Sequence, residues 1–378
     1  MPPHRHLSPS RRELRALRLR LLRLRDELGL IRRDHWHRKY NPNQPRVPSG
    51  NAGGGQWTSG GGGSGGSGSE NPAFPDGVAV EGEAGWSSLG EGWNEDGSVF
   101  EQAVTDGQGT TIQSEYAASR AAGFDERQTV IRPDGNTISF ETTDKVQSIR
   151  FGGPDGELVA RTIWTPSGPE PDATVQPAFS RRDAFSTIIG GGAALFNWQS
   201  PLNGSDGQQA VMGFNAHDYR PGNSMSGKLE LSYSGRVSNE EAELACRRLP
   251  DVRELADRAA SATGSPDLYP SSAAYGTAVH ARFKNYVDDR YDPNFKAEQS
   301  FLKETSEGAR ESAVRYGYPG SIRVDAYEYR QDGTLCVYDL KTGKAGLSDR
   351  RAEFLANAAK LGFGPVRRIL VIEVRPKQ

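Results

Sequence analysis

Three charged side chains late in the sequence have the types and the spacing to hold a metal ion next to an activated water. Asp339 and Lys341 stand two positions apart in an apolar run that begins at Leu335 and is typical of a β-strand. Residues two apart on a strand point to the same face, so these two side chains are expected to share one face. Asp325 belongs to the preceding strand-like segment and can lie beside them across the sheet. Two carboxylates and an ammonium group at one place predict a divalent-cation site that activates water.

A tight hairpin would bring these residues together. The strands expected over 322–329 and 335–341 flank Asp332-Gly333, and Asp-Gly is a strong signal for a hairpin turn. The other elements expected around the hairpin are helices over 250–260, 273–289 and 349–361 and strands over 297–301 and 368–374. His280 falls in the second of these helices and Glu298 in the first of these strands.

Each of these residues also has a purely structural interpretation. Charges are rare in an apolar strand unless they are paired, so Asp339 and Lys341 could form a structural ion pair. His280 could be a structural histidine of its helix. The functional interpretation is favoured for Asp325, Asp339 and Lys341, and both interpretations of Glu298 stay open.

The composition favours several domains and a substantial linker. The chain of 378 residues is long enough for two or three domains, but only 35% of its residues are hydrophobic and 45 are glycine. The net charge is −2 but is unevenly spread, because residues 1–47 hold 13 Lys/Arg against 4 Asp/Glu and the remainder holds 33 against 44. A basic arm on an acidic body indicates a tail with a partner of its own.

Five segments follow from these patterns. Residues 1–40 are expected to form a basic amphipathic helix whose leucines repeat at heptad spacing, and residues 41–75 form a disordered Gly/Ser/Pro-rich linker. Residues 76–165 carry repeated Asp-Gly turns between strand-like runs, which predicts an antiparallel β-hairpin-rich spacer. Residues 166–249 are a mixed region, and residues 250–378 are predicted to be an α/β domain.

The two cysteines, Cys246 and Cys336, are far apart in the sequence. Such a pair indicates neither a disulfide scaffold nor a zinc site, and it favours folding in a reducing compartment with Cys336 as a packed thiol. No apolar run reaches the length needed to span a bilayer, and no secretory signal with an uninterrupted apolar core is visible. The sequence therefore predicts a protein without a transmembrane segment.

The element order and three short motifs resemble the PD-(D/E)xK nuclease superfamily. The motifs are Gly276-Thr-Ala-Val-His280, Gly320 followed by Asp325, and Tyr338-Asp339-Leu-Lys341-Thr-Gly343. The chain is most similar to RecB-type and lambda-exonuclease-like members, over residues 250–378. Two departures stand out: the Gly-to-Asp spacing is longer than in the RecB pattern, and Arg350, Arg351 and Glu353 stand where those enzymes carry a Gln-x-x-x-Tyr motif.

The resemblance implies a restriction-endonuclease-like domain with an αβββαβ core that hydrolyses phosphodiester bonds with Mg²⁺ or Mn²⁺. Asp325, Asp339, His280 and Glu298 would be its metal ligands, and Lys341 would orient or deprotonate the attacking water. The side chains expected to contact nucleic acid are Arg323, Lys344, Arg350 and Arg351. Analogy with the fold favours DNA over RNA as the substrate.

A nuclease-like domain behind a β-rich spacer, a linker and a basic helix resembles the organisation of bacterial polymorphic toxins. This resemblance implies an effector that is made in the bacterial cytoplasm, delivered into a target cell by secretion machinery, and blocked in the producer by a cognate immunity protein. Two alternatives stay open. One is an RNase toxin of the same fold, and the other is a non-catalytic phage-like or structural protein with a nuclease-like binding domain.

Overall fold

The computed structural model of the chain describes its β-rich and α/β parts. The described residues are 85–172, 174–175, 182–204, 206–216, 230–302, 313–314, 321–343, 346–347, 351 and 366–377. The predicted N-terminal helix and the predicted linker lie outside these residues. So do Lys344, Arg350 and all but one residue of the helix predicted over 349–361.

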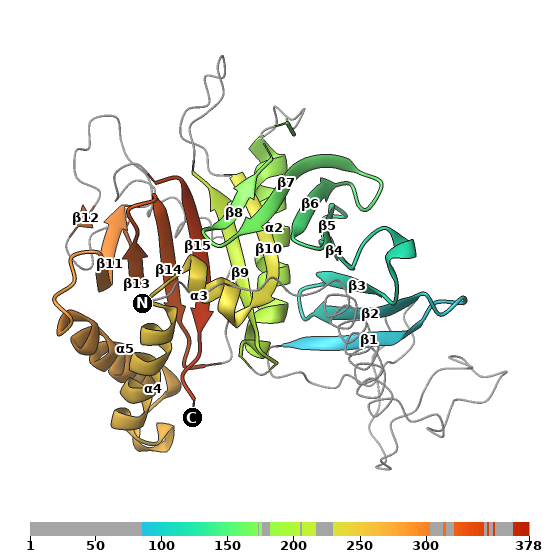
Figure 1. Cartoon of the computed structure of the whole chain (residues 1–378). Helices are drawn as coiled ribbons and strands as arrows, with labels where there is room; N and C mark the ends of the chain where they lie inside the picture. The colour runs from blue at the N-terminus through green and yellow to red at the C-terminus, as the bar shows by residue number, and fades with distance from the viewer. Residues whose placement is uncertain are drawn as a thin grey trace, which may run out of the picture. The chain divides into compact units, whose positions relative to one another are not determined.

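The first described sheet is an antiparallel meander, as the sequence predicts. Its eight strands, all within the described residues, pair in chain order (Figure 1). They are β1 (Trp86–Trp93), β2 (Val99–Asp106), β3 (Thr111–Ala117), β4 (Glu126–Ile131), β5 (Thr137–Thr143), β6 (Val146–Phe151), β7 (Glu157–Thr165) and β8 (Gly168–Pro171).

Local turn chemistry explains the hairpins. In three Asp-Gly turns the aspartate carboxylate accepts a hydrogen bond from the backbone N–H two residues on, at Ser98, Asn136 and Thr334, over 2.9, 3.0 and 2.9 Å. The glycine after each aspartate takes a positive φ, of 70°, 82° and 79°. Asx turns and glycine suit these positions because the first supplies a local acceptor and the second tolerates the left-handed region.

The second sheet carries the site residues. Its strands, in spatial order, are β10 (Glu230–Ser238), β9 (Gln208–Asn215), β15 (Arg368–Val374), β14 (Thr334–Leu340), β13 (Ser321–Tyr329), β11 (Phe295–Leu302) and β12 (Ala313–Val314). Strands β11, β13 and β14 pair antiparallel, whereas β14 and β15 pair in parallel with Asp339 beside Glu373. The predicted hairpin is therefore the centre of a mixed sheet.

This sheet begins before residue 250, where the α/β domain was expected to start. Strand β9 pairs antiparallel with β15, and β10 pairs with β9. A boundary at 249/250 would remove two strands from the sheet. Local sequence patterns do not predict this arrangement, because β9 and β15 are distant in the chain. The residues of a strand do not show with which other strand it pairs.

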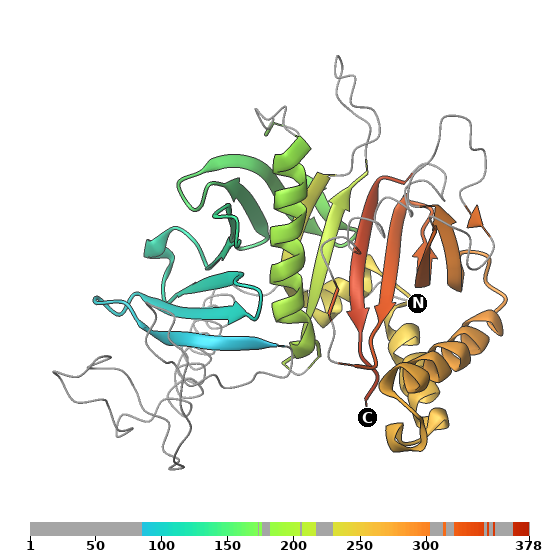
Figure 2. The ribbon, with the colours of Figure 1, turned by 180° about the vertical axis from the view of Figure 1, so that it is seen from behind.

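Helix α2 (Arg182–Gln199) contributes to the core shared by the two sheets (Figure 2). Its glycine run allows close approach on both sides. A Cβ on Gly191 would lie 2.9 Å from Cδ1 of Ile138 in β5, and a Cβ on Gly192 would lie 2.5 Å from Cδ2 of Leu231 in β10. The apolar Gly-Gly-Gly stretch is thus a buried helix between sheets. Among the described residues no helix combines the length and apolar character of a membrane span.

Three further helices lie along the second sheet. These are α3 (Asn239–Ala245), α4 (Leu249–Thr263) and α5 (Ser272–Asp288). A capping box between Ser238 and Glu241 begins α3, and the Ser271 side chain caps the N-terminus of α5. Buried residues of α4 and α5 pack with Tyr338 and Leu340 of β14 in one hydrophobic core. The helix that carries His280 is therefore fixed against the strand that carries Asp339.

The expectation of unpaired cysteines is wrong. Cys246, at the C-terminal cap of α3, forms a disulfide with Cys336 in β14 across 90 residues of sequence. Both residues are fully buried. Spacing in the sequence could not show this pairing, because the fold alone brings the end of α3 against β14. The bond therefore removes the argument from the cysteines for folding in a reducing compartment, because disulfides persist in oxidising ones.

Candidate metal centre

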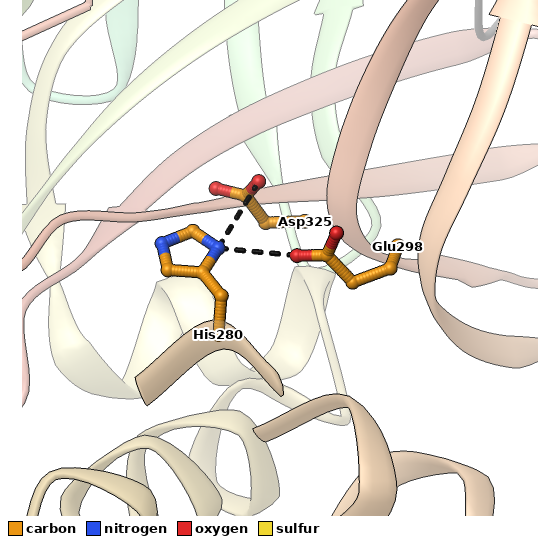
Figure 3. A group of neighbouring side chains, drawn as sticks. All are labelled: His280, Glu298 and Asp325. Carbon is orange, nitrogen blue, oxygen red and sulfur yellow. Dashed lines mark hydrogen bonds and ion pairs between the residues drawn. The ribbon is translucent and has the colours of Figure 1, made fainter. Parts of the chain in front are cut away.

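His280 reaches the sheet from α5 and is held at both ring nitrogens. Its Nε2 lies 3.1 Å from the carbonyl oxygen of Leu340 in β14. Because a carbonyl oxygen can only accept, Nε2 carries a proton and donates it. Its Nδ1 lies 3.1 Å from Oε1 of Glu298 and 3.6 Å from Oδ1 of Asp325 (Figure 3). The second nitrogen therefore faces two carboxylates.

That arrangement requires a positive charge at or beside Nδ1. With Nε2 protonated, a neutral ring would point the Nδ1 lone pair at negative oxygens. Burial alone would lower the pKa of His280, but the hydrogen bond with Glu298 and the charges of Asp325 and Glu298 outweigh it and raise the pKa above 6.5. A proton satisfies this requirement, and so does a cation bound to all three groups. Metal-binding histidines commonly donate their other N–H to a carbonyl in this way.

Glu298 lies in a conformation that its residue type rarely adopts. Its φ is 56°, in the left-handed region, although it lies in the middle of β11. Pairing of β11 with β13 places it opposite Asp325, between the pairs Ala297–Ala326 and Gln299–Val324. Its Oε2 forms an ion pair with Nε of Arg323, 2.5 Å away. Strain of this kind concentrates at functional sites, because the surrounding structure must enforce it.

Asp325 is buried beside the end of the β13–β14 ladder. The last ladder pair is Ala326–Tyr338, and beyond it the Asp325 Oδ2 accepts a hydrogen bond from the backbone N–H of Leu340 at 2.8 Å. Burial and the nearby charge of Asp339 raise the pKa of Asp325 to about 6. Its other oxygen, Oδ1, faces His280, and this leaves a buried carboxylate oriented toward the imidazole.

Asp339 is enclosed by two cations. Its Oδ2 lies 2.9 Å from Nζ of Lys341, and its Oδ1 lies 2.7 Å from Nη2 of Arg351. The Asp339 side chain is 0% exposed, and burial would raise its pKa. The charges of Arg351 and Lys341 outweigh burial and hold the pKa below its usual value. Asp339 is therefore ionised at neutral pH.

The donor set fits a small divalent cation. One ligand atom each from His280, Glu298 and Asp325 lies within 4.8 Å of the others. Asp339 adjoins them, since Nη2 of Arg351 also lies 3.7 Å from Oδ1 of Asp325. Carboxylate oxygens suit Mg²⁺ and Mn²⁺, and the imidazole shifts the preference toward Mn²⁺. A cation bound here would also supply the positive charge that is required beside Nδ1 of His280.

The sequence-predicted residues fall into four groups. His280, Glu298 and Asp325 come together, and Asp339 and Lys341 form an ion pair next to them. Arg323 and Arg351, expected on nucleic acid, contact carboxylates of the site. Lys344 and Arg350 lie outside the described residues.

Glu373 is a site neighbour that sequence reasoning missed. It lies in β15, next to Asp339 in the parallel ladder, and its side chain is fully buried. Its Oε1 accepts hydrogen bonds from Ser200 Oγ and Arg375 Nε, at 3.0 and 2.6 Å, while Oε2 has no hydrogen-bond partner among the described residues. The sequence signal that could have found Glu373 is a single carboxylate in an apolar strand, which is the same signal that indicated Asp339. Glu298, Asp325, Asp339 and Glu373 thus lie on four adjacent strands.

Acidification is expected to weaken metal binding at this centre. A metal ion needs His280 without a proton on Nδ1 and Asp325 in its ionised form. Both groups have raised pKa values, so protons compete already near neutral pH. Mn²⁺ affinity measured by titration calorimetry should fall by about tenfold or more between about pH 8 and about pH 5.5. His280→Asn should flatten the profile. An affinity that does not change with pH would contradict the assignment of His280 as a ligand.

Gly276 allows α5 to approach the site closely. A Cβ at this position would lie 2.8 Å from Oγ1 of Thr342, two residues after the end of β14. Gly276→Val is expected to push α5 outward, lengthen the bond from His280 to Leu340, and weaken Mn²⁺ binding by about tenfold. Ala273→Val, on the exposed first turn of the same helix, is the matched control. Equal Mn²⁺ affinity in the two variants would show that the glycine has no role in positioning His280.

Comparison of the chain with models of known protein families, with curated proteins and with solved structures finds no match. The chemical interpretation of this centre therefore rests on its own residues and geometry.

Proposed function

We propose that this protein is a metal-dependent nuclease. The observation that carries the proposal is the convergence of His280, Glu298 and Asp325 within 4.8 Å, with the Asp339–Lys341 pair adjoining. A helix, an antiparallel run of three strands and a parallel strand after the Asp-x-Lys strand frame the site. This arrangement supports a restriction-endonuclease-like domain with an αβββαβ core, which is part of the proposal.

Each residue has a role that follows from its surroundings. His280, Glu298, Asp325 and Asp339 would hold Mg²⁺ or Mn²⁺, which when bound supplies charge neutralisation at the scissile phosphate and acidifies a water. Leu340 fixes the tautomer of His280 through its carbonyl, so that Nδ1 is the ligand atom. Lys341 holds its ammonium at the border of the buried carboxylates, where it can orient the attacking water or stabilise phosphate charge.

DNA is the proposed substrate, and the proposed setting is an effector delivered into a rival bacterium. The resemblance to polymorphic toxins supports this setting. The Cys246–Cys336 disulfide supports passage through an oxidising compartment during delivery. In the producing cell, a cognate immunity protein would block the nuclease.

The decisive experiment uses the purified full chain, because β9 and β10 belong to the same sheet as the site. Supercoiled plasmid is incubated with Mg²⁺ or Mn²⁺, with and without EDTA, alongside parallel reactions on transfer RNA. Cleavage of plasmid that EDTA abolishes is expected. If only RNA is cleaved, the proposed activity becomes that of an RNase. If neither substrate is cleaved, the non-catalytic binding role is favoured.

A second experiment tests the effector role. The full chain is expressed in the cytoplasm of a bacterial strain that permits disulfide formation, and growth and chromosome integrity are followed. Growth arrest with loss of DNA is expected for the native sequence, and both effects should disappear in Asp339→Ala and Lys341→Ala. Equal toxicity of the native chain and these variants would contradict a nuclease mechanism.

A further inference from the structure

Arg351 occupies the place between two carboxylates of the candidate metal centre. Its Nε and Nη2 donate to Oδ1 of Asp339 at 3.0 and 2.7 Å. The same Nη2 lies 3.7 Å from Oδ1 of Asp325, the oxygen that also faces His280. The guanidinium thus binds one predicted metal ligand and lies beside a second.

This position is electrostatically favourable only while no other cation is present. Asp325 and Asp339 are almost wholly buried, with side-chain exposures of 6% and 0%, so two adjacent negative charges need compensation. Arg351 supplies it, and their charges raise the pKa of its guanidinium although burial opposes this. A divalent cation bound through the same oxygens would supply the compensation instead. The two positive groups would then repel each other at short range.

Arg351 can leave more easily than the carboxylates can. Its side chain is 31% exposed, and it is held through charged hydrogen bonds at the guanidinium end. Lys341 would still neutralise Asp339 through Oδ2 after such a movement, because the two cations use different oxygens of Asp339.

We propose that Arg351 is the resident counter-ion of the metal centre. It neutralises Asp325 and Asp339 in the metal-free chain, gives way when a divalent cation binds, and then presents its charge to a substrate phosphate. The inference rests on the proposed nuclease function. It adds that metal binding and nucleic-acid binding are coupled through one arginine.

The test compares two equilibria in the full chain. Mn²⁺ affinity is measured by calorimetry, and affinity for a fluorescent phosphorothioate DNA duplex that resists cleavage is measured by anisotropy with Mn²⁺. Arg351→Met should bind Mn²⁺ about tenfold or more tightly than the native chain, because the competing ion pair is gone. The same variant should bind DNA several-fold more weakly. A merely structural arginine would not shift the two affinities in opposite directions.

Arg248→Met is the matched control, because Arg248 is similarly exposed and also bridges two carboxylates, Asp251 and Asp292. Both affinities should be unchanged in it. Arg351→Lys, which keeps the charge and so protects the fold, should give a smaller gain in Mn²⁺ affinity. If Arg351→Met loses its fold, Arg351→Lys decides the question.

Unchanged or weaker Mn²⁺ binding in a folded Arg351 variant would overturn the counter-ion role while leaving the nuclease proposal standing. Tighter Mn²⁺ binding without weaker DNA binding would overturn the coupling to substrate. Absence of Mn²⁺ binding by the native chain would instead overturn the metal centre itself, and the counter-ion role with it.

Discussion

Lys341→Met is expected to reduce metal-dependent phosphodiester cleavage by about 10²–10⁴-fold, which is the usual contribution of a positioned general acid–base group. The Lys341 ammonium lies 2.9 Å from Oδ2 of Asp339, next to the proposed metal ligands, and the side chain retains 18% exposure. It is therefore close enough to the centre to act on a water and open enough to meet substrate. Initial rates on a fluorescent duplex, with Mn²⁺ saturating, measure the effect.

The metal-free variant should keep its fold, because Arg351 still neutralises Asp339 through Oδ1. Mn²⁺ affinity should stay within about threefold of the native value, since an ammonium group is not a ligand. Lys296→Met, on the exposed side of β11, is the matched control and should cleave at the native rate. Native cleavage by Lys341→Met would remove Lys341 from the mechanism, whereas loss of both cleavage and Mn²⁺ binding would indicate a structural role.

Features that depend on local chemistry could be predicted from the sequence. The hairpin turn at Asp332-Gly333 follows from an Asx hydrogen bond and a positive φ, both set within three residues. The placement of Asp339 and Lys341 in a strand follows from the apolar run around them. Period-two alternation then places the two side chains on one face, where Nζ of Lys341 lies 2.9 Å from Oδ2 of Asp339.

Features that depend on distant partners could not be predicted in this way. Strand β9 joins β15 over a long separation, and only the folded sheet shows that the site rests on residues before 250. The ion pair of Arg351 with Asp339 arises because a fully buried carboxylate requires compensation from whatever cation the fold brings near, and the expected contact of Arg351 with phosphate stays a prediction. The arginine is visible in the sequence, but the burial of Asp339, which creates the need for a neighbouring positive charge, is not.

Glu373 is an intermediate case. An isolated carboxylate in the apolar strand β15 is visible in the sequence, but its meaning depends on the parallel register that places it beside Asp339. Burial raises its pKa, and Asp339 adds to this effect while Arg375 opposes it. Arg375 also donates to the carbonyl oxygen of Gly343, directly after the Asp-x-Lys strand. Glu373 therefore connects the end of β15 to the segment that follows the site.

Loss of the Cys246–Cys336 disulfide is expected to lower the free energy of unfolding by about 4–5 kcal/mol, on the chain-entropy estimate for a loop of this length. The bond closes 90 residues of sequence, including α4, α5, β11 and β13, so the unfolded chain gains much freedom when it opens. Urea unfolding followed by circular dichroism, with and without dithiothreitol, measures it.

The matched control is the double variant Cys246→Ala/Cys336→Ala, whose stability should not respond to dithiothreitol. The oxidised native chain should be the most stable of the three samples, and the reduced native chain should lie close to the double variant. Because Cys336 lies three residues before Asp339, reduction should also loosen the metal centre and weaken Mn²⁺ binding. If dithiothreitol leaves the unfolding midpoint of the native chain unchanged while thiol titration shows two free cysteines, the disulfide contributes nothing to stability, and the argument for passage through an oxidising compartment fails with it.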